Sequence, residues 1–236
     1  MRGGGGVTGA TTMTSTTIQE GGRVMPLSKT AKLMARHMIN AWQAPMFALG
    51  CEVDMSAAMS GRAAGVTVTD VILLACVRTL AEHPKLNAHY GDDAIVEFDA
   101  VNIGLAVAAE KGLTVPVIHA AQSLSLAEIA ARRRDLVEKT RAGRVRITDV
   151  TGGTFTVSNL GMFDITRFTA IINPPQVAIL AVGSVNRRQV WNGGEPQWRP
   201  ISELTLTCDH RAIDGAAGAA FLGALKRRLE GKETAA

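Results

Sequence analysis

The chain has 236 residues, of which 47% are hydrophobic, 19% charged and 4% aromatic, a composition typical of a folded protein. Its net charge is only +4, and no Lys/Arg run is interleaved with aromatic residues, so the sequence predicts no nucleic-acid partner. No apolar run is long enough to cross a bilayer, and the first 22 residues lack the apolar centre of a secretory signal. We therefore expect a cytoplasmic protein with no membrane partner.

The three cysteines, Cys51, Cys76 and Cys208, are scattered along the chain and odd in number. None falls in a Cys-x-x-Cys or zinc-type spacing, so the sequence predicts neither a disulfide framework nor a structural metal. The histidines show no His-Glu-x-x-His arrangement. We therefore expect three core thiols and no metal site.

The first half of the chain predicts an arm followed by alternating helices and strands. Residues 1–24 are rich in Gly, Thr and Ser, so we expect a disordered N-terminal arm. A helix begins after Ser28 and ends near Pro45, and a strand over 46–55 follows it. A second helix begins at Thr69 or Asp70 and ends before residue 84. Two apolar segments, at 101–108 and 113–118, predict a hairpin.

The second half predicts more strands. A capping box of Ser125 and Glu128 begins a helix whose arginines at 132–134 we expect to face largely toward solvent. Short β-rich segments at 154–158, 177–182 and 204–208 are typical of a mixed sheet, and a last helix spans about 215–229. This order predicts one α+β domain over 25–230, with helices packed on one mixed sheet, and a polar tail at 231–236.

The most informative segment is LTCDHRAIDG at residues 206–215, in which a strand delivers His210 into a turn that ends with Asp214. An imidazole takes a proton from a thiol or hydroxyl at neutral pH and returns it, which is the task of a general base in acyl transfer. Asp214 either orients His210 directly or fixes the turn through an arginine. A lone histidine is more often structural, but these neighbours favour a catalytic one.

A second informative segment, TGGTFTVSNLG at 151–161, contains Ser158, and AIINPPQ follows it at 170–176. With the histidine motif, these segments resemble the catalytic domain of dihydrolipoamide acyltransferases, the acyltransferase component of 2-oxo acid dehydrogenase complexes. Further matching blocks are PLS at 26–28, EVD at 52–54, HPKLNA at 83–88 and NIGLAV at 102–107. The resemblance therefore covers about residues 25–229, and it extends more distantly to chloramphenicol acetyltransferase and to peptide-synthetase condensation domains.

This resemblance implies a chloramphenicol acetyltransferase-like fold and a homotrimer with its active sites between subunits. It implies that His210 is the general base and that Ser158 of the next subunit donates a hydrogen bond to the oxyanion of the tetrahedral intermediate. Asp214 matches a position that supports the histidine loop. The implied co-substrate is an acyl-CoA, with acetyl-CoA expected, and we expect no covalently attached lipoate.

Three other interpretations of the same residues stay open. Ser158, His210 and Asp214 are also the residue types of a hydrolase triad, although VSNLG is not the G-x-S-x-G elbow of a nucleophile. Cys208 lies two residues before His210, but a buried thiol is a simpler interpretation than a Cys–His pair. An inactive trimeric scaffold is the third, and the presence of all three site residues weighs against it.

Four departures from the family pattern determine the expected acceptor. The sequence shows no lipoyl domain with its subunit-binding domain, and it ends in polar residues instead of a hydrophobic anchor, which predicts an isolated trimer. His119 stands where a basic residue is usual, and Met46 stands where histidine is frequent. We therefore expect a stand-alone O-acetyltransferase that acts on a small-molecule hydroxyl, as in tetronate antibiotic biosynthesis. The alternative is a dihydrolipoamide acyltransferase core that acts on lipoyl domains in trans.

Overall fold

The computed structural model describes residues 23, 25–91, 93–109 and 112–232. The expected N-terminal arm at 1–24, apart from Arg23, lies outside the described residues, as do residues 233–236 of the expected polar tail.

A six-stranded mixed sheet forms the centre of the fold. In spatial order its strands are β1 (Met46–Asp54), β10 (Glu195–Asp209), β9 (Ala178–Asn192), β8 (Phe155–Asn159), β4 (Ile103–Leu105) and β7 (Val117–Ile118). Strand β8 runs parallel to β9 and β4, and the other neighbouring pairs are antiparallel. The predicted α+β class with one mixed sheet is confirmed.

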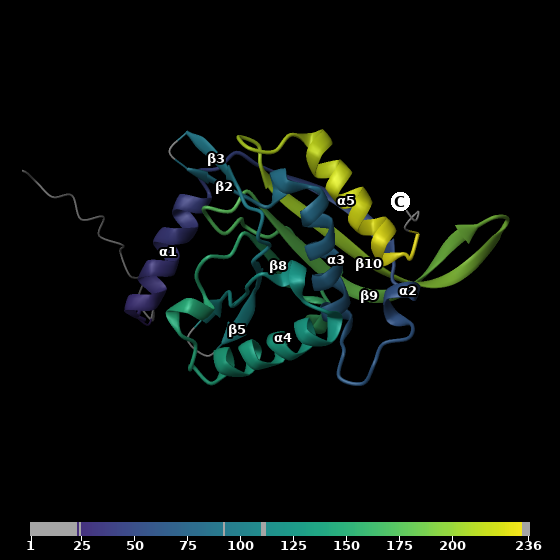
Figure 1. Ribbon diagram of the computed structural model, residues 1–236, viewed down its shortest axis with the longest axis horizontal. Helices are drawn as coiled ribbons and strands as arrows, with labels where there is room; N and C mark the ends of the chain where they lie inside the picture. Colours follow the sequence, from purple (N-terminus) through teal and green to yellow (C-terminus); the bar gives the residue numbers. More distant parts are fainter. Residues whose placement is uncertain (1–22, 24, 92, 110–111, 233–236) are drawn as a thin grey trace, which may run out of the picture.

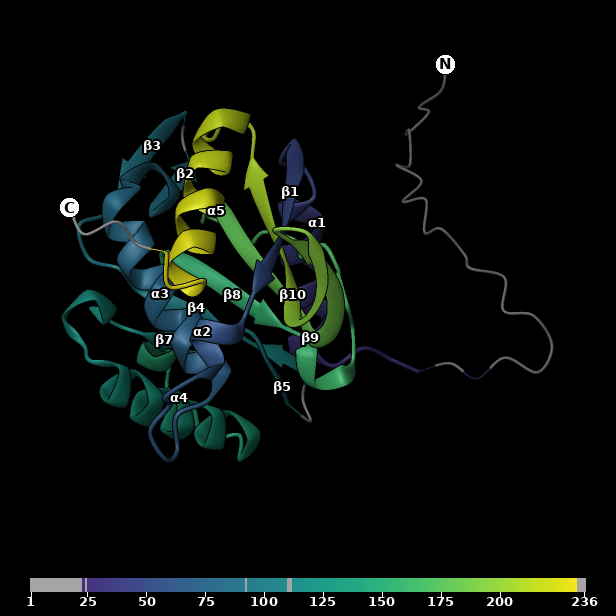
Figure 2. The same cartoon turned by 90° about the vertical axis from the view of Figure 1, so that its right-hand side faces the viewer.

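Helices α3 (Val68–Glu82) and α5 (Gly215–Leu229) lie side by side on one face of this sheet (Figures 1 and 2). Helix α4 (Leu126–Arg141) packs against α3, and the short α2 (Ser56–Met59) follows β1. Apolar side chains of the two covering helices, such as Leu73, Leu80 and Phe221, are fully buried against the strands. Because burial of apolar area is the main stabilising term, this layer supports the sheet that carries the candidate site residues.

Helix α1 (Lys29–Ala41) lies apart from that layer (Figure 1). Its His37 Nε2 lies 2.9 Å from Asn173 Oδ1, in the loop that leads into β9. Two small hairpins complete the chain: β2 (Ala88–Gly91) with β3 (Ala94–Glu97), and β5 (Val107–Ala109) with β6 (Gly112–Thr114). Single 3-10 turns lie at Pro84–Leu86, Ala121–Ser123, Ile147–Asp149 and Gly161–Phe163.

The predicted helix starts are confirmed at three of four positions, including Gly215 for α5. Ser28 caps α1 by accepting a hydrogen bond from Ala31 N at 3.1 Å, and Ser125 and Glu128 form the expected capping box on α4. The second helix begins earlier than predicted, because Thr67 is its cap and Asp70 is the third helical residue of a capping box. Aspartate is favoured both as the cap of a helix and as the third residue of a capping box. The sequence pattern alone therefore misplaces the start of this helix.

Strands β9 and β10 are much longer than the predicted segments at 177–182 and 204–208. Both have 15 residues, and their outer halves form a hairpin that projects from the body (Figure 1). Trp191 and Trp198 on this hairpin are 74% and 58% exposed. Because the outer halves pack on no core, they lack the alternation that predicts a strand. The remaining sequence signal for this hairpin is the Asn192-Gly193 pair, which is typical of a tight turn between two strands.

Gly183 in β9 lies at a position where a larger side chain does not fit. A Cβ at this position would lie 1.9 Å from Thr166 O, in the segment between β8 and β9. We expect Gly183→Ala to lower the free energy of unfolding by about 1–3 kcal/mol, the usual cost of overpacking, as measured by urea denaturation. Gly50→Ala is the control. The atom nearest to its added Cβ, Leu204 O, is 3.9 Å away, so this variant should lose no stability. An equal loss in both variants would show that overpacking is not the cause.

Candidate functional site

His210 is the first residue after β10, and its side chain is exposed. Its backbone N–H donates to Pro45 O at 3.0 Å, and its ring centroid lies 4.7 Å from that of Phe47. Within the described chain, neither ring nitrogen of His210 makes a hydrogen bond. Three other histidines have a hydrogen-bond partner for the ring: Asn173 for His37, Gly153 for His89 and Thr148 for His119. His83, like His210, makes a ring contact, with Phe221. His210 therefore has both ring nitrogens available for proton transfer.

The turn that carries His210 is held by Asp209, which the sequence pattern did not single out. The Asp209 carboxylate is 4% exposed, and it accepts hydrogen bonds from Arg211 N at 3.0 Å and from Arg211 Nη2 at 2.6 Å. The hydrogen bond to this carboxylate raises the pKa of Arg211. The guanidinium carbon of Arg211 lies 4.1 Å from the centroid of the Tyr90 ring. The sequence signal for this contact is the pair of opposite charges, Asp209 and Arg211, on either side of His210.

Within the described residues of one chain, Asp214 makes neither of the two contacts considered for it. Its exposed carboxylate accepts a hydrogen bond from Ala217 N at 2.7 Å and so caps the N-terminus of α5. It makes no hydrogen bond to His210 or to an arginine in the part of the chain that the structure describes. An aspartate at this position satisfies an unpaired helical N–H and complements the helix dipole. Asp214 therefore supports the turn through the helix that follows it.

Ser158 lies on β8 and is half-buried. It lines a cavity of about 250 Å³, and its hydroxyl has no hydrogen-bond partner among the described residues. The cavity wall combines apolar side chains, such as Leu105, Val137 and Phe163, with the guanidinium groups of Arg133 and Arg141. Ser158 therefore presents a free hydroxyl to a partly apolar cavity.

The sheet register separates Ser158 from His210 within one chain. Ser158 pairs with Ala181 of β9, and Ala181 pairs with Thr205 of β10. The end of β10 at Asp209 is thus two strands across and four residues along from Ser158, roughly 17 Å by standard strand spacings. His210 begins beyond that point. The two side chains do not meet within one protomer.

Arg132 and Arg134 are exposed, as expected, but Arg133 departs from the expectation that the arginines at 132–134 largely face solvent. Its Nε lies 2.5 Å from Asp70 Oδ1, and the two side chains are 14% and 0% exposed. Burial by itself raises the pKa of Asp70, but hydrogen bonds from Arg133 and Thr67 outweigh it and hold that pKa below its ordinary value. The pair links α4 to the start of α3 beside the Ser158 cavity.

The cysteine thiols do not act with the histidine. Burial raises the pKa of Cys208 to about 12 and that of Cys51 to about 11, and it raises the pKa of Cys76 as well. Cys208 Sγ faces α5, because a Cβ on Gly218 would lie 3.5 Å from it. Its pKa and its orientation toward the helix layer argue against a Cys–His pair.

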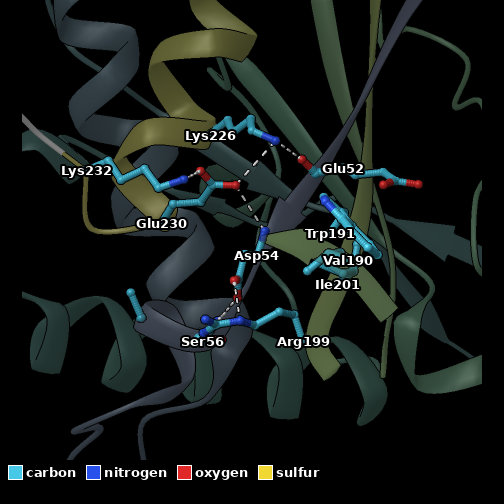
Figure 3. Close-up of a pocket in the computed structure, with 11 residues that line it drawn as sticks. Glu52, Asp54, Ser56, Val190, Trp191, Arg199, Ile201, Lys226, Glu230 and Lys232 are labelled. Carbon is cyan, nitrogen blue, oxygen red and sulfur yellow. Dashed lines mark hydrogen bonds and ion pairs between the residues drawn. The ribbon is translucent and has the colours of Figure 1, made fainter. Parts of the chain in front are cut away.

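A cavity of about 590 Å³ lies at the opposite end of β1, beside the last turn of α5 (Figure 3). The Glu230 carboxylate in this cavity is 6% exposed. It pairs with Lys232 at 2.8 Å and Lys226 at 3.3 Å and accepts the Asp54 N–H at 3.2 Å. The Glu230 carboxylate is thus satisfied by groups of this chain, and neither Ser158 nor His210 lines the cavity. It is therefore not our candidate site.

The described ranges hold no metal-binding cluster and no membrane span. They contain no group of three or more His, Cys, Asp or Glu side chains placed to hold a metal ion. None of their helices is both long and apolar enough to span a bilayer. Of the two unusual residues in the sequence, Met46 pairs with Asp209 beside the histidine turn, whereas His119 follows β7 at the opposite edge of the sheet.

The Arg133–Asp70 pair predicts a pH-dependent stability. Arg133→Gln leaves a buried carboxylate without its cation, so we expect a loss of about 3–5 kcal/mol in the free energy of unfolding near neutral pH. The lowered pKa of Asp70 stabilises the fold above the unfolded-state pKa of about 3.9, and this contribution is lost as the pH falls through the folded-state pKa. The difference between variant and wild type should therefore shrink below about pH 4. The exposed Arg132→Gln is the control, and a loss of stability independent of pH would contradict the prediction.

Comparison with known proteins identifies the family. The model of the 2-oxoacid dehydrogenases acyltransferase (catalytic domain) matches residues 19–236. The dihydrolipoyllysine-residue acetyltransferase component of the pyruvate dehydrogenase complex of Rickettsia bellii is 36% identical over 220 residues, which cover 88% of this chain and 53% of the relative. The chain thus spans about half the length of the curated relatives it matches.

Solved structures agree with this match. A probable dihydrolipoamide acetyltransferase from Listeria monocytogenes superposes with a TM-score of 0.86 and 33% identity, covering 92% of this chain and 98% of that one. The Azotobacter vinelandii dihydrolipoamide acetyltransferase, studied for the role of a serine, a histidine and an asparagine in its catalytic mechanism, gives 0.85 and 32%, covering 88% and 91%. Chloramphenicol acetyltransferase shares the fold, with a TM-score of 0.54 at 17% identity and coverage of 84% and 93%.

The expected acceptor is wrong. We expected an O-acetyltransferase that acts on a small-molecule hydroxyl in tetronate antibiotic biosynthesis, but these relatives are named as acetyltransferases of dihydrolipoyllysine or dihydrolipoamide. The expectation rested mainly on how the sequence begins and ends. Acceptor choice depends on the side chains that surround the reacting atoms, and the two ends of the sequence carry no information about those.

The expected fold class and the expectation of an acyltransferase enzyme are both confirmed by these matches. The family model covers more than half of the chain, and its match over residues 19–236 includes Ser158 and His210. The chain therefore belongs to the 2-oxoacid dehydrogenase acyltransferase family, through that family's catalytic domain.

Proposed function

We propose that residues 25–230 form the catalytic domain of a dihydrolipoyllysine-residue acetyltransferase. In this proposal the domain moves an acetyl group between the thiol of CoA and a thiol of a dihydrolipoyl group that a lipoyl domain carries. The observation that carries the proposal is the family match over residues 19–236, and the names of the relatives support the choice of acceptor. Acetyl-CoA is the co-substrate, and the chain needs no metal for this chemistry.

His210 acts as the general base. A ring nitrogen takes the proton of the attacking thiol, and the sulfur then forms a new C–S bond to the thioester carbonyl. The tetrahedral intermediate collapses, the original C–S bond breaks, and the departing sulfur takes the proton back from the imidazolium. The exposed ring with two unengaged nitrogens supports this role.

Ser158 donates a hydrogen bond to the oxyanion of that intermediate, across a subunit boundary. The register keeps Ser158 and His210 of one chain apart, so a complete site requires His210 of one subunit and Ser158 of the next. A cyclic homotrimer supplies three such sites from one repeated contact. Asp214 is a positioning residue, which fixes the helix that follows the histidine turn.

The Azotobacter vinelandii protein supports this choice of residues. Its serine, histidine and asparagine are separated by the same intervals of sequence that separate Ser158, His210 and Asp214. Asp214 stands where that protein has asparagine, and both side chains are good helix caps.

We expect the purified protein to convert acetyl-CoA to CoA in the presence of dihydrolipoamide, as followed by chromatography and mass spectrometry. Oxidised lipoamide, which has no free thiol, is the matched control and should give no conversion. His210→Ala should lower kcat by about 10²–10⁴-fold, and Ser158→Ala by about 10²–10³-fold. Thermal unfolding should show that both variants are folded. No turnover by the folded wild-type protein with dihydrolipoamide would reject the proposal and favour an inactive scaffold.

Mixing the two inactive variants tests the site between subunits. When His210→Ala and Ser158→Ala chains are dissociated and reassembled in equal amounts, about one quarter of the sites in a random cyclic trimer should combine an intact histidine with an intact serine. We therefore expect about one quarter of wild-type activity. Each variant reassembled alone is the control. If both residues act within one chain, the mixture will stay inactive.

A further inference from the structure

We propose that Asp209, Arg211 and Tyr90 form a clamp that positions His210 for proton transfer. This inference rests on the proposed function, because it assigns the three residues to the base of that reaction. None of the three touches the ring of His210 in the hydrogen bonds or ring contacts of the structure. They are positioning residues, and they act through the backbone that carries the histidine.

Asp209 is the buried end of the clamp. Its carboxylate is 4% exposed, and a buried carboxylate is costly unless charged donors satisfy it. Arg211 supplies those donors, through Nε at 3.0 and 3.2 Å from the two oxygens and Nη2 at 2.6 Å. Such a two-point, charge-assisted pair fixes both partners in direction as well as in distance. The side chains on either side of His210 are therefore locked to each other.

Tyr90 ties this pair to a distant segment of the chain. Its ring lies under the Arg211 guanidinium at 4.1 Å, a distance suited to cation–π attraction. Tyr90 belongs to β2, and its N–H donates to Pro175 O at 2.8 Å, in the loop before β9. Arg211 is thus held from one side by Asp209 and from another by β2.

The backbone hydrogen bonds leave His210 little freedom except in its side-chain torsions. Asp209 N donates to Val177 O at 2.9 Å and His210 N to Pro45 O at 3.0 Å, while Asp209 O accepts from Ala212 N and Ile213 N. The contact with Phe47 restricts the ring further. A misplacement of about 1 Å in a catalytic group costs on the order of 100-fold in rate. A clamp at this turn therefore has a direct catalytic consequence.

The clamp extends from the buried Asp209 carboxylate to partly exposed side chains at the surface. The Arg211 side chain is 41% exposed, and Tyr90 is only half-buried at the edge of the small β2–β3 hairpin. Arg211→Gln leaves the buried Asp209 carboxylate without its cation and should also lower the free energy of unfolding. The clamp is therefore tested on kcat, in variants that thermal unfolding shows to be folded. This separates a positioning role from a purely structural one.

The first test uses Asp209→Asn, Arg211→Gln and the double variant in the acetyl-CoA and dihydrolipoamide assay. We expect each single variant to lower kcat on the order of 100-fold and to leave KM for both substrates unchanged. Because the residues act as one unit, the double variant should be no slower than the slower single variant. Full kcat in both single variants, or a rise in KM at unchanged kcat, would overturn the inference.

The second test varies the ring under Arg211. Tyr90→Phe keeps the aromatic face and should retain wild-type kcat, whereas Tyr90→Leu removes it and should lower kcat by about tenfold at unchanged KM. Equal kcat in these two variants would contradict the role of Tyr90. This pair decides the question if Asp209→Asn does not fold, since Tyr90 is only half-buried and both of its variants keep an apolar side chain there.

Two control variants distinguish the clamp from the general loss of an ion pair and from a failure of the proposed base. Arg228→Gln also removes an arginine that pairs with a carboxylate, Glu82 at 2.8 Å, but near the far end of α5, and it should keep full activity. His210→Ala separates the two hypotheses. If that variant stays active, the proposed base fails and the clamp fails with it. If it is inactive while the folded clamp variants are fully active, only the clamp is overturned.

Discussion

The position of the candidate site depends on the register of the central sheet. In the hydrogen-bonded pairing of β8, β9 and β10, Ser158 lies opposite Ala181 and Ala181 lies opposite Thr205, while His210 lies beyond the end of β10. Strands in a buried sheet cannot slip by one residue without moving their apolar side chains to the wrong face. The separation of the serine from the histidine is therefore a fixed property of the fold, and it makes assembly a requirement for the proposed chemistry.

Each chain carries two different half-sites in the proposed mechanism, and each half-site has its own support. The histidine half rests on a turn that the Asp209–Arg211 pair and the cap of α5 hold in place. The serine half borders a cavity whose wall is fixed by the buried Arg133–Asp70 pair. In both halves a buried or partly buried carboxylate is satisfied by arginine, which is the donor best suited to two-point pairing. Acyl transfer needs both halves at one thioester.

Local signals in the sequence predicted most of the elements, whereas the candidate site residues rest on the family resemblance. The caps at Ser28 and Ser125 and the helix at 215–229 were predictable because their signals are local. The outer halves of β9 and β10 were not, since they lack a buried face, and neither was the Arg133–Asp70 pair, whose partners meet only through tertiary packing. The resemblance selected His210 and Ser158, but it did not reveal Asp209, and the inferred hydroxyl acceptor was wrong.

The most direct measurement is an experimental structure of the assembled protein with a non-hydrolysable thioester analogue of acetyl-CoA. We predict that the carbonyl oxygen of the analogue lies within hydrogen-bond reach of Ser158 Oγ of one subunit, while a ring nitrogen of His210 from its neighbour faces the reacting sulfur. An assembly in which His210 faces solvent, with no serine of another subunit near the bound carbonyl, would contradict the proposed mechanism.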